Sequence, residues 1–338
     1  MAADNQLSFG DGLLSSRRKR CKLAEQLSEL DQLIDWSVLV EEISGIDKTD
    51  RKIGGRPRTN PIWMIKAIFL QHLFSLSDPQ LEDQLIDRLS FQKFVGIHLD
   101  QEIPCFTTFW RFKEALARNG LDQKIFERVN EGLGQQGLFL KKGTIVDAVI
   151  LPSSNRPLSD EKREKLDKEP SHQIDTDARS TKKRGQWYFG YKGHIGVDIG
   201  SKLIRTLTFT PAHEHDSTQT EALISYDEGS LFGDKAYFDN YHKYSARKYG
   251  WYYGVLEKPA RGQKLSGKQK KRNRKHSRVR ASVEHPFAWM KTKAGLTRMR
   301  AKNQIRNRLR FVFTCIGWNL SRTAFLRRGT KPMGLVGL

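Results

Sequence analysis

The chain has 338 residues, of which 38% are hydrophobic and 29% charged, and its formal net charge is +21. That length allows two domains with separate cores, and the charge indicates a polyanionic partner. The three cysteines form no CxxC pair, and no apolar run reaches the roughly 18 residues of a bilayer span, which argues against a disulfide framework, a thiolate zinc site and a membrane role.

The first 137 residues predict short helices joined by turns. Residues 1–16 lack the basic start and apolar stretch of a signal peptide, so we expect a cytoplasmic protein. Residues 1–40 are expected to form a loose arm and a first helix. Residues 54–61 are a turn-rich linker that carries Arg56 and Arg58. Apolar spacing predicts helices over 23–34, 36–43, 62–76, 77–88, 109–118 and 121–133.

Residues 41–137 are therefore predicted to be a helical domain that is compatible with a DNA-binding domain. Thr107 or Thr108 would cap the helix over 109–118, which should expose Arg111 and Lys113. Helices joined by tight turns are compatible with a helix-turn-helix DNA reader, and a plain helical bundle is at least as common.

From Gly143 onward the sequence alternates between strand-like and helical segments. Strands are expected over 144–151, 187–198, 203–209, 231–234 and 251–256, and helices over 216–226, 241–249, 279–293 and 304–325. Residues 152–185 read as a polar surface insertion and 259–277 as a basic loop. Three strands followed by helix, strand, helix and strand is the ribonuclease-H-like order. The fold class is therefore α/β: a catalytic domain over 143–328 with a mixed five-stranded sheet and flanking helices, after an all-α N-terminal domain and before a tail over 329–338.

Glu284 is the only acidic residue between Lys258 and the C-terminal Leu338, in a tract rich in lysine and arginine. Such a tract attracts polyanions, most commonly nucleic acid. A lone carboxylate there is either an ion-pair partner of Arg280, four residues earlier, or a ligand for a metal cation that bridges to phosphate. On one continuous helix Arg280, Glu284 and Lys291 would share a face. Both interpretations stay open at this point.

Two further carboxylates stand out among apolar residues. Asp147 lies within an apolar predicted strand, on the face that also carries Ile145 and Val149, where an ionised carboxylate is costly unless it is paired or binds a metal. Asp234 follows the short strand that ends at Gly233, and ligand sites gather at the carboxyl ends of strands in α/β sheets. Together with Glu284, these acids could bind one or two Mg²⁺ ions for an in-line phosphodiester displacement.

Several other polar side chains are weaker candidates. His213, His215 and Asp216 could ligate zinc, although one tight cluster without a second is more often a polar turn. His194 and Asp198 alternate along a predicted strand and could support the site indirectly.

These residues carry a resemblance to the DDE transposases of bacterial insertion sequences, in particular the insertion-sequence-five family. It covers about residues 40–325 and is specific as a set, although each motif alone is weak. In the first half the matches are Gly55-Arg-Pro-Arg58, Leu76-Ser-Asp78, Asp87-Arg-Leu-Ser-Phe91 and Thr107-Thr-Phe-Trp-Arg-Phe112. In the second half they are Asp147-Ala148, Asp175-Thr-Asp-Ala-Arg179, Tyr188-Phe-Gly-Tyr-Lys-Gly-His-Ile195, His215-Asp216-Ser217, Gly233-Asp-Lys-Ala-Tyr237 and Arg280-Ala-Ser-Val-Glu-His-Pro-Phe287.

The resemblance implies that Asp147, Asp234 and Glu284 form the catalytic metal-binding triad, with two Mg²⁺ ions for which Mn²⁺ could substitute. Arg280, Glu284 and Lys291 match the family pattern Tyr-x2-Arg-x3-Glu-x6-Lys, whereas Ser277 stands at the tyrosine position. The expected DNA contacts are Arg280, Lys291, Lys235, Arg56, Arg58, Arg111, Lys270, Lys271, Arg272 and Arg274.

The function implied is that of a bacterial, nucleoid-associated transposase. It would bind the terminal inverted repeats of its element, cleave the strands and join them to target DNA, with double-stranded DNA as partner and no small-molecule substrate. Synapsis of two ends implies a homodimer or larger assembly. Two alternatives stay open: a catalytically silent, sequence-specific DNA-binding protein derived from a transposase, and a ribonuclease-H-like nuclease without strand transfer.

Overall fold

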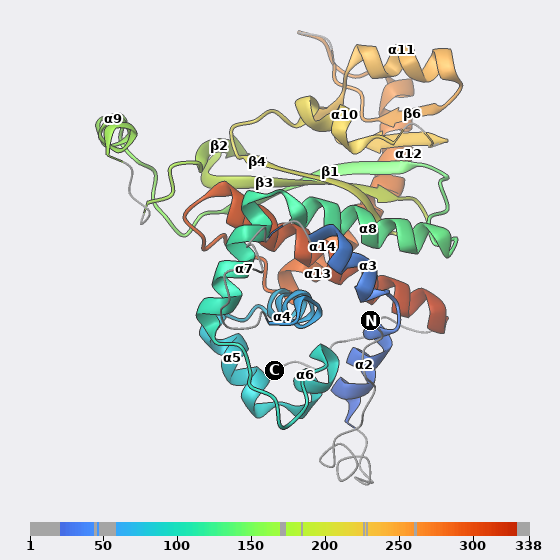
Figure 1. Ribbon diagram of the computed structural model, residues 1–338. Helices are drawn as coiled ribbons and strands as arrows, with labels where there is room; N and C mark the ends of the chain where they lie inside the picture. Colours follow the sequence, from blue (N-terminus) through green and yellow to red (C-terminus); the bar gives the residue numbers. More distant parts are fainter. Residues whose placement is uncertain are drawn as a thin grey trace.

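The computed structural model of the protein describes residues 21–43, 46, 59–169, 174–183, 185–225, 227, 229–259 and 262–329. Arg56 and Arg58, the predicted N-terminal arm over residues 1–20 and all but the first residue of the predicted tail lie outside this part of the chain. In the described part, helices of the N-terminal half are followed by a mixed sheet with flanking helices, as Figure 1 shows.

Two of the N-terminal helices begin after residues whose side chains satisfy free backbone N–H groups. Asn60 Oδ1 accepts from the Ile62 amide at 2.9 Å, and Ser77 and Gln80 form a reciprocal capping box. The helices are α2 (Lys22–Asp31), α3 (Trp36–Ile43), α4 (Pro61–Leu73), α5 (Asp78–Asp87), α6 (Leu89–Val95), α7 (Phe106–Arg118) and α8 (Leu121–Gln135).

Two details of this half differ from the prediction. The sequence reading missed α6, whose seven residues are too few to show two helical periods. Helix α7 begins at Phe106, and the residue before it is Cys105. Neither predicted threonine caps it: Thr107 and Thr108 lie inside its first turn, where their hydroxyls contact Cys105 Sγ at 3.0 and 3.3 Å.

The sheet contains the five predicted strands in the order β4-β3-β1-β5-β6. Strands β3 and β4 run antiparallel to their neighbours, whereas β1, β5 and β6 are parallel to one another, so the ribonuclease-H-like order is confirmed. The bounds are β1 (Thr144–Pro152), β3 (Gln186–Asp198), β4 (Ile204–Pro211), β5 (Ser230–Gly233) and β6 (Tyr252–Val255).

The predicted polar insertion over 152–185 has structure of its own. It contains α9 (Asp160–Lys168) and a sixth strand, β2 (Arg179–Lys183), which pairs with the first half of β3. The sequence Arg-Ser-Thr-Lys-Lys carries no apolar alternation because β2 buries neither face. A pattern search for half-buried strands therefore misses it.

Alternate residues of β1 point into two different clusters. Ile145 and Val149 belong to the main core, whereas Val146 packs with Leu231 and Tyr237 in a smaller cluster on the other face. The smaller cluster is covered by η3 (Asp216–Gln219), α10 (Thr220–Leu223), η4 (Lys235–Tyr237) and α11 (Asn240–Tyr249). Asp147 therefore lies on the main-core face, as its alternation with Ile145 and Val149 predicted.

The long helix α14 (Gln304–Arg328) packs against both halves of the chain. It contacts α4, α7 and α8 on one side and β4 on the other, so it lies between the N-terminal helices and the sheet (Figure 1). Its Phe311 ring fills the space above Gly193 of β3, where an added Cβ would come within 2.4 Å of the ring. The main core includes Leu27 of α2, Phe209 of β4 and Ala324 of α14, so it joins both halves of the chain. The division into domains stays a prediction.

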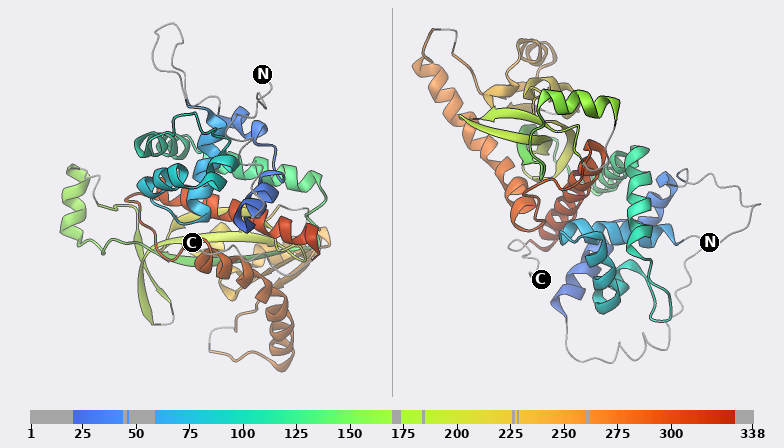
Figure 2. Two further views of the ribbon diagram at one scale, coloured as in Figure 1. Left: turned by 90° about the horizontal axis from the view of Figure 1, so that it is seen from below. Right: turned by 90° about the vertical axis from the view of Figure 1, so that its left-hand side faces the viewer.

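The basic stretch after β6 was predicted as a loop, and this prediction was wrong. Ser266 and Gln269 form a capping box that starts α12 (Gly267–Arg280). Lysine and arginine are good helix formers, so a sequence without apolar periodicity still forms a helix here. The predicted helix over 279–293 is also divided: the turn η5 (Ala281–Val283) separates α12 from α13 (Glu284–Thr292). Figure 2 shows α12 and α9 extending from different sides of the molecule.

Candidate active site

Asp147 and Asp234 lie next to each other at the centre of the sheet. The parallel pairing of β1 and β5 places Val146 opposite Gly233, and each aspartate is the next residue of its own segment. An added Cβ at Gly233 would come within 2.9 Å of the Val146 side chain, so glycine permits this close approach. Asp234 Oδ1 accepts from the Lys235 amide at 2.7 Å and thereby starts η4.

Glu284 is the first residue of α13, at the point where the chain leaves η5. Its side chain is exposed, and η5 packs against β1, the strand that carries Asp147. The position in the first turn follows from Pro286, which lacks an N–H and is tolerated only near a helix start. The predicted shared helix face is wrong, because Arg280 ends α12 and Glu284 begins a different helix.

The pKa of Asp147 is raised to about 6, mainly because the carboxyl group is buried. The Arg280 cation and the Ala148 N–H oppose this rise, whereas the negative charges of Asp234 and Glu284 add to it. Asp147 Oδ1 accepts from the Ala148 amide at 2.9 Å, and Oδ2 pairs with Arg280 Nη1. The three predicted carboxylates therefore share one electrostatic environment.

Arg280 pairs with Asp147, so the interpretation of Glu284 as the ion-pair partner of Arg280 is wrong. The sequence offered Glu284 as its ion-pair partner, but the structure pairs Arg280 with an acid 133 residues away in the chain. The Arg280 side chain is 24% exposed, and its buried Nε has no hydrogen-bond partner. In the absence of a cation, Arg280 compensates part of the negative charge at Asp147.

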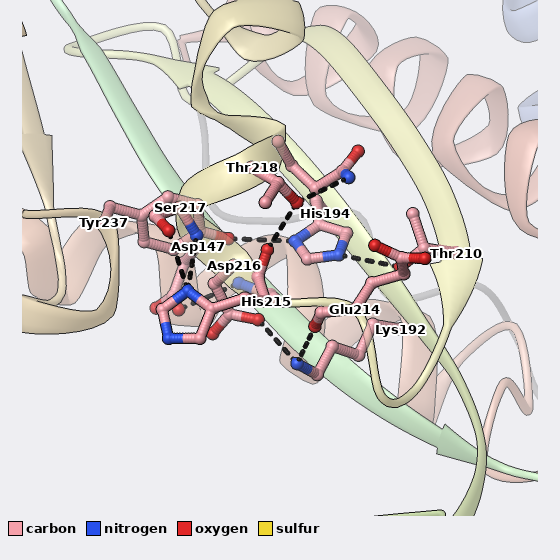
Figure 3. A network of polar contacts seen from close by, with 12 residues as sticks. Asp147, Lys192, His194, Thr210, Glu214, His215, Asp216, Ser217, Thr218 and Tyr237 are labelled. Atoms are coloured by element: carbon pink, nitrogen blue, oxygen red, sulfur yellow. Dashed lines mark hydrogen bonds and ion pairs between the residues drawn. The ribbon is translucent and has the colours of Figure 1, made fainter. Parts of the chain in front are cut away.

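A polar network supports the opposite face of the same strands (Figure 3). His194 Nδ1 lies 3.0 Å from the Tyr237 hydroxyl and its Nε2 lies 3.2 Å from Thr210 Oγ1. Burial lowers the pKa of His194 to about 4, so the ring is neutral. Because Tyr237 belongs to η4, this contact joins β3 to the turn that begins at Asp234; the indirect role of His194 stays a prediction.

The weaker candidates have local partners. Lys192 Nζ lies 2.8 Å from Asp216 Oδ1, and His215 Nδ1 lies 2.7 Å from Ser217 Oγ, as expected of a polar turn (Figure 3). Asp198 lies at the far end of β3, where it accepts hydrogen bonds from the Lys141 amide and the Ser201 hydroxyl. Within the described ranges, no three His, Cys, Asp or Glu side chains converge into a ready-made metal cage.

The donor chemistry of the carboxylates nevertheless suits a divalent cation. Carboxylate oxygens are the ligands that Mg²⁺ prefers, and a cation would relieve the repulsion that Asp234 and Glu284 exert on Asp147. Asp147 and Asp234 are adjacent, as a shared cation would require. Asp147 also forms an ion pair with Arg280. A cation bound here would have to share or replace that ion pair.

Most of the predicted DNA contacts are exposed. They include Lys235 on η4, Lys291 in the last turn of α13, Arg111 on α7, and Lys270, Lys271, Arg272 and Arg274 on α12. Arg272 differs from its neighbours because its Nε lies 2.7 Å from Glu257 Oε1, which cancels part of its charge. Lys113 was expected to be exposed, but it is largely buried and pairs with Asp78.

The sequence reading also missed what attaches α12 to the sheet. His276 is buried, and its Nε2 lies 2.7 Å from the Tyr252 hydroxyl of β6. Asn273 accepts from the Glu257 amide at 2.9 Å through its side-chain oxygen. His276 and Asn273 are three residues apart, a helical spacing of polar uncharged side chains within a basic run that could have indicated one anchored face.

None of the helices in the described part of the chain is long and apolar enough to cross a membrane. Residues 139–320 match the family model described as Transposase DDE domain, and residues 15–115 match Transposase domain (DUF772). The fold is similar to a piggyBac transposase in a synaptic complex with hairpin DNA, at 10% identity and a TM-score of 0.44, over 92% of this chain and 75% of that chain. The DDE match spans more than half of the chain, which therefore belongs to the DDE transposase family of insertion sequences.

Proposed function

We propose that the chain cleaves DNA at the ends of an insertion sequence and joins those ends to target DNA, with Asp147, Asp234 and Glu284 as its catalytic metal-binding residues. One observation carries the proposal: Asp147 within β1 lies beside Asp234 directly after β5, and Glu284, at a helix start, adds to the electrostatic field that raises the pKa of Asp147. Of the three, Glu284 lies in the strongly basic C-terminal part of the chain.

The three carboxylates would hold two Mg²⁺ ions, or Mn²⁺ in their place, and members of this family generally use divalent metal. When bound, such ions supply Lewis-acid stabilisation of charge on the phosphodiester oxygens. Arg280 holds the Asp147 carboxylate in one orientation. Lys235 lies beside Asp234 and Lys291 two helical turns beyond Glu284, where each can bind a phosphate of the DNA end.

The remaining basic residues would fix the DNA over a longer path. Arg111 on α7 would contact the element end, together with the sequence-predicted contacts Arg56 and Arg58, while the exposed cations of α12 would neutralise backbone phosphates. The partners in this proposal are the element ends and the target duplex, bound by a homodimer or larger assembly in the bacterial nucleoid. Membership of the insertion-sequence-five branch stays a prediction.

A cleavage and joining assay tests the proposal and separates it from its two rivals. The substrate is a duplex made from the DNA that flanks the gene, incubated with purified protein and Mg²⁺, with a plasmid as target. The proposal expects 3′-end cleavage at the inverted repeat and covalent products with the plasmid. Specific binding without cleavage would identify a silent DNA-binding protein, and cleavage without joined products would identify a nuclease.

The acidic limb of the cleavage rate should depend on Arg280. Asp147 has a pKa of about 6 in the folded protein, so its ionised form is lost as the pH falls through that value. Arg280 opposes the rise in this pKa, and Arg280→Gln should therefore move the acidic limb to higher pH. The measurement is single-turnover cleavage at several pH values and fixed salt.

The control for this prediction is Arg278→Gln, which removes an exposed positive charge from the same helix without touching Asp147. Arg280→Lys keeps the charge and should restore most of the shift if the effect is electrostatic. An unchanged acidic limb in Arg280→Gln, or an equal shift in Arg278→Gln, would contradict the role assigned to the Arg280–Asp147 pair.

A further inference from the structure

A cavity of about 300 Å³ lies away from the three carboxylates, where helices α4, α5 and α7 meet α14 and the turn at residues 300–301. We call it the α4–α14 cavity. The side chains that matter are Gln71, His72, Trp110, Lys113, Arg300 and Arg310, all of which line it. Its volume is at the lower end of the range of ligand pockets, roughly 300–1,000 Å³.

The α4–α14 cavity contains more positive charge than its own acids compensate. Lys113 pairs with Asp78, and Arg306 Nε lies 2.5 Å from Glu114 Oε2. Within the part of the chain that the structure describes, Arg300 and Arg310 have no carboxylate partner. The two guanidinium groups are therefore available for an anion that enters the cavity.

The Arg310 guanidinium is largely buried without a negatively charged partner among the described residues. Its guanidinium donates to neutral oxygens alone: the Arg298 and Gly295 carbonyls, both at 3.1 Å, and Ser75 Oγ at 3.3 Å. Burial, with a further contribution from the neighbouring Arg300 charge, lowers the pKa of Arg310 to about 10. Ser75 has a left-handed backbone (φ 56°), a strained conformation for a non-glycine residue that binding sites often contain.

The opposite wall presents polar atoms without partners. Gln71 is 2% exposed, and its Nε2 donates to Asp78 Oδ1 at 2.5 Å, which fixes the amide orientation. Its buried Oε1 has no hydrogen-bond partner, and neither has the buried Nε2 of the adjacent His72. Burial holds the pKa of His72 well below its usual value, so this ring is neutral. A buried acceptor left unpaired is unfavourable, and a donor from a ligand would satisfy it.

An aromatic face completes the lining. The Trp110 ring is 44% exposed, and the Arg306 guanidinium lies 5.0 Å from its centroid. A heteroaromatic base can stack on such a ring, and this stacking tolerates any base because every base has a π-face. The lining therefore offers a partner for each part of a nucleotide. The two arginines without carboxylate partners suit the phosphate, the unpaired Gln71 oxygen suits a donor on the base edge, and the Trp110 ring suits the base face.

We propose that the α4–α14 cavity binds a single nucleotide, with the phosphate at Arg300 and Arg310 and the base between Gln71 and Trp110. The nucleotide can come from two sources: an unpaired nucleotide of the bound DNA or a free deoxynucleoside monophosphate. Since none of the three carboxylates lines the cavity, the proposal goes beyond the cleavage function and does not rest on it.

Binding of dAMP and of inorganic phosphate to the full-length protein tests the site, with titration calorimetry as the readout. Arg300→Gln should weaken both probes about tenfold, the loss expected for one charge-assisted hydrogen bond. Gln71→Met should weaken dAMP and leave phosphate unchanged. Arg298→Gln is the matched control, because Arg298 is exposed on the same loop and lies outside the lining; it should change either affinity less than twofold.

Equal weakening by Arg300→Gln and Arg298→Gln would overturn the proposal, as would failure of the wild type to bind dAMP more tightly than Arg300→Gln does. A second arm distinguishes the sources. If saturating dAMP weakens duplex binding by the wild type and not by Arg300→Gln, DNA supplies the nucleotide; if duplex affinity is unaffected, the free nucleotide is the ligand. The Asp147→Asn variant should bind dAMP as tightly as the wild type does. That result would show that the cavity works independently of cleavage, so failure of the cleavage function would not count against it.

Discussion

Replacing Asp147 by Asn is expected to abolish DNA cleavage and joining while it makes the folded protein more stable. The loss of a metal-binding carboxylate should lower the cleavage rate by a factor on the order of 10³ or more, because such ligands account for several kcal/mol of charge stabilisation. DNA affinity should remain within a few-fold of wild type, since the cations proposed to bind phosphates are other, exposed residues.

The gain in stability follows from the sign of the pKa shift. The pKa of Asp147 rises from its ordinary value of 3.8 to about 6 on folding, so the folded protein binds this proton more tightly than the unfolded chain. Stability is therefore lost as the pH rises from about 4 to about 6, and the loss persists at pH 7.5. Asn resembles the protonated acid and avoids this loss, so the free energy of unfolding should rise by about 1–3 kcal/mol.

Asp198→Asn is the matched control, because it is a buried aspartate of the same sheet with a different role. Its carboxylate accepts hydrogen bonds from the Leu140 and Lys141 amides and from the Ser201 hydroxyl. Asn has one acceptor oxygen where Asp has two, so this variant should lose about 1–3 kcal/mol of stability and retain cleavage at permissive temperature. Urea denaturation measures both changes. Near-normal cleavage by Asp147→Asn would remove that residue from the active site.

The second large effect is expected on the salt dependence of DNA binding. Lys270, Lys271 and Arg274 are exposed on α12, and no described acid pairs with them, in contrast to Arg272. Each phosphate contact contributes about −0.9 to the slope of log K against log salt. Replacing these three residues by Gln should therefore flatten the slope by about 2–3 if each contacts a phosphate, with the largest loss of affinity at low salt.

Helix α9 offers a control with the same change in charge. Lys162, Lys165 and Lys168 are exposed on α9, where Asp160, Glu161 and Glu164 surround them. Their replacement by Gln should change the slope by less than about 0.9, the contribution of one phosphate contact. Equal flattening by both triple variants would mean that net charge, and not the surface of α12, determines the salt dependence.

The order of the sheet could be predicted because its core strands have a recognisable apolar pattern: they are either apolar throughout or alternate between apolar and polar residues. Strand β1 shows apolar residues at nearly every position, and Gly250 ends α11 in a left-handed conformation as such glycines do. Helix α12 and strand β2 could not be predicted from pattern, because neither has an apolar face to display. Their structure depends on caps and pairing with neighbours.

Among the site residues, the sequence identified Asp147 by its burial in an apolar strand and Asp234 by its place at a strand end. It could not show that Arg280 binds Asp147, since the two residues are 133 positions apart in the chain and meet only through packing. It also gave no sign of the α4–α14 cavity, whose wall combines residues from four helices and a turn. Long-range juxtapositions of this kind follow from packing and not from local spacing.

The most direct test of the central claim is metal-dependent cleavage by Asp234→Cys. A thiolate binds Mg²⁺ poorly and accepts softer ions such as Mn²⁺ more readily. If Asp234 is a metal ligand, this variant should bind the end duplex normally, show no measurable cleavage in Mg²⁺ and regain at least a tenfold higher rate in Mn²⁺, whereas the wild type should change little between the two ions. Cleavage by Asp234→Cys at the wild-type rate in Mg²⁺ would contradict the assignment of this carboxylate to the metal site.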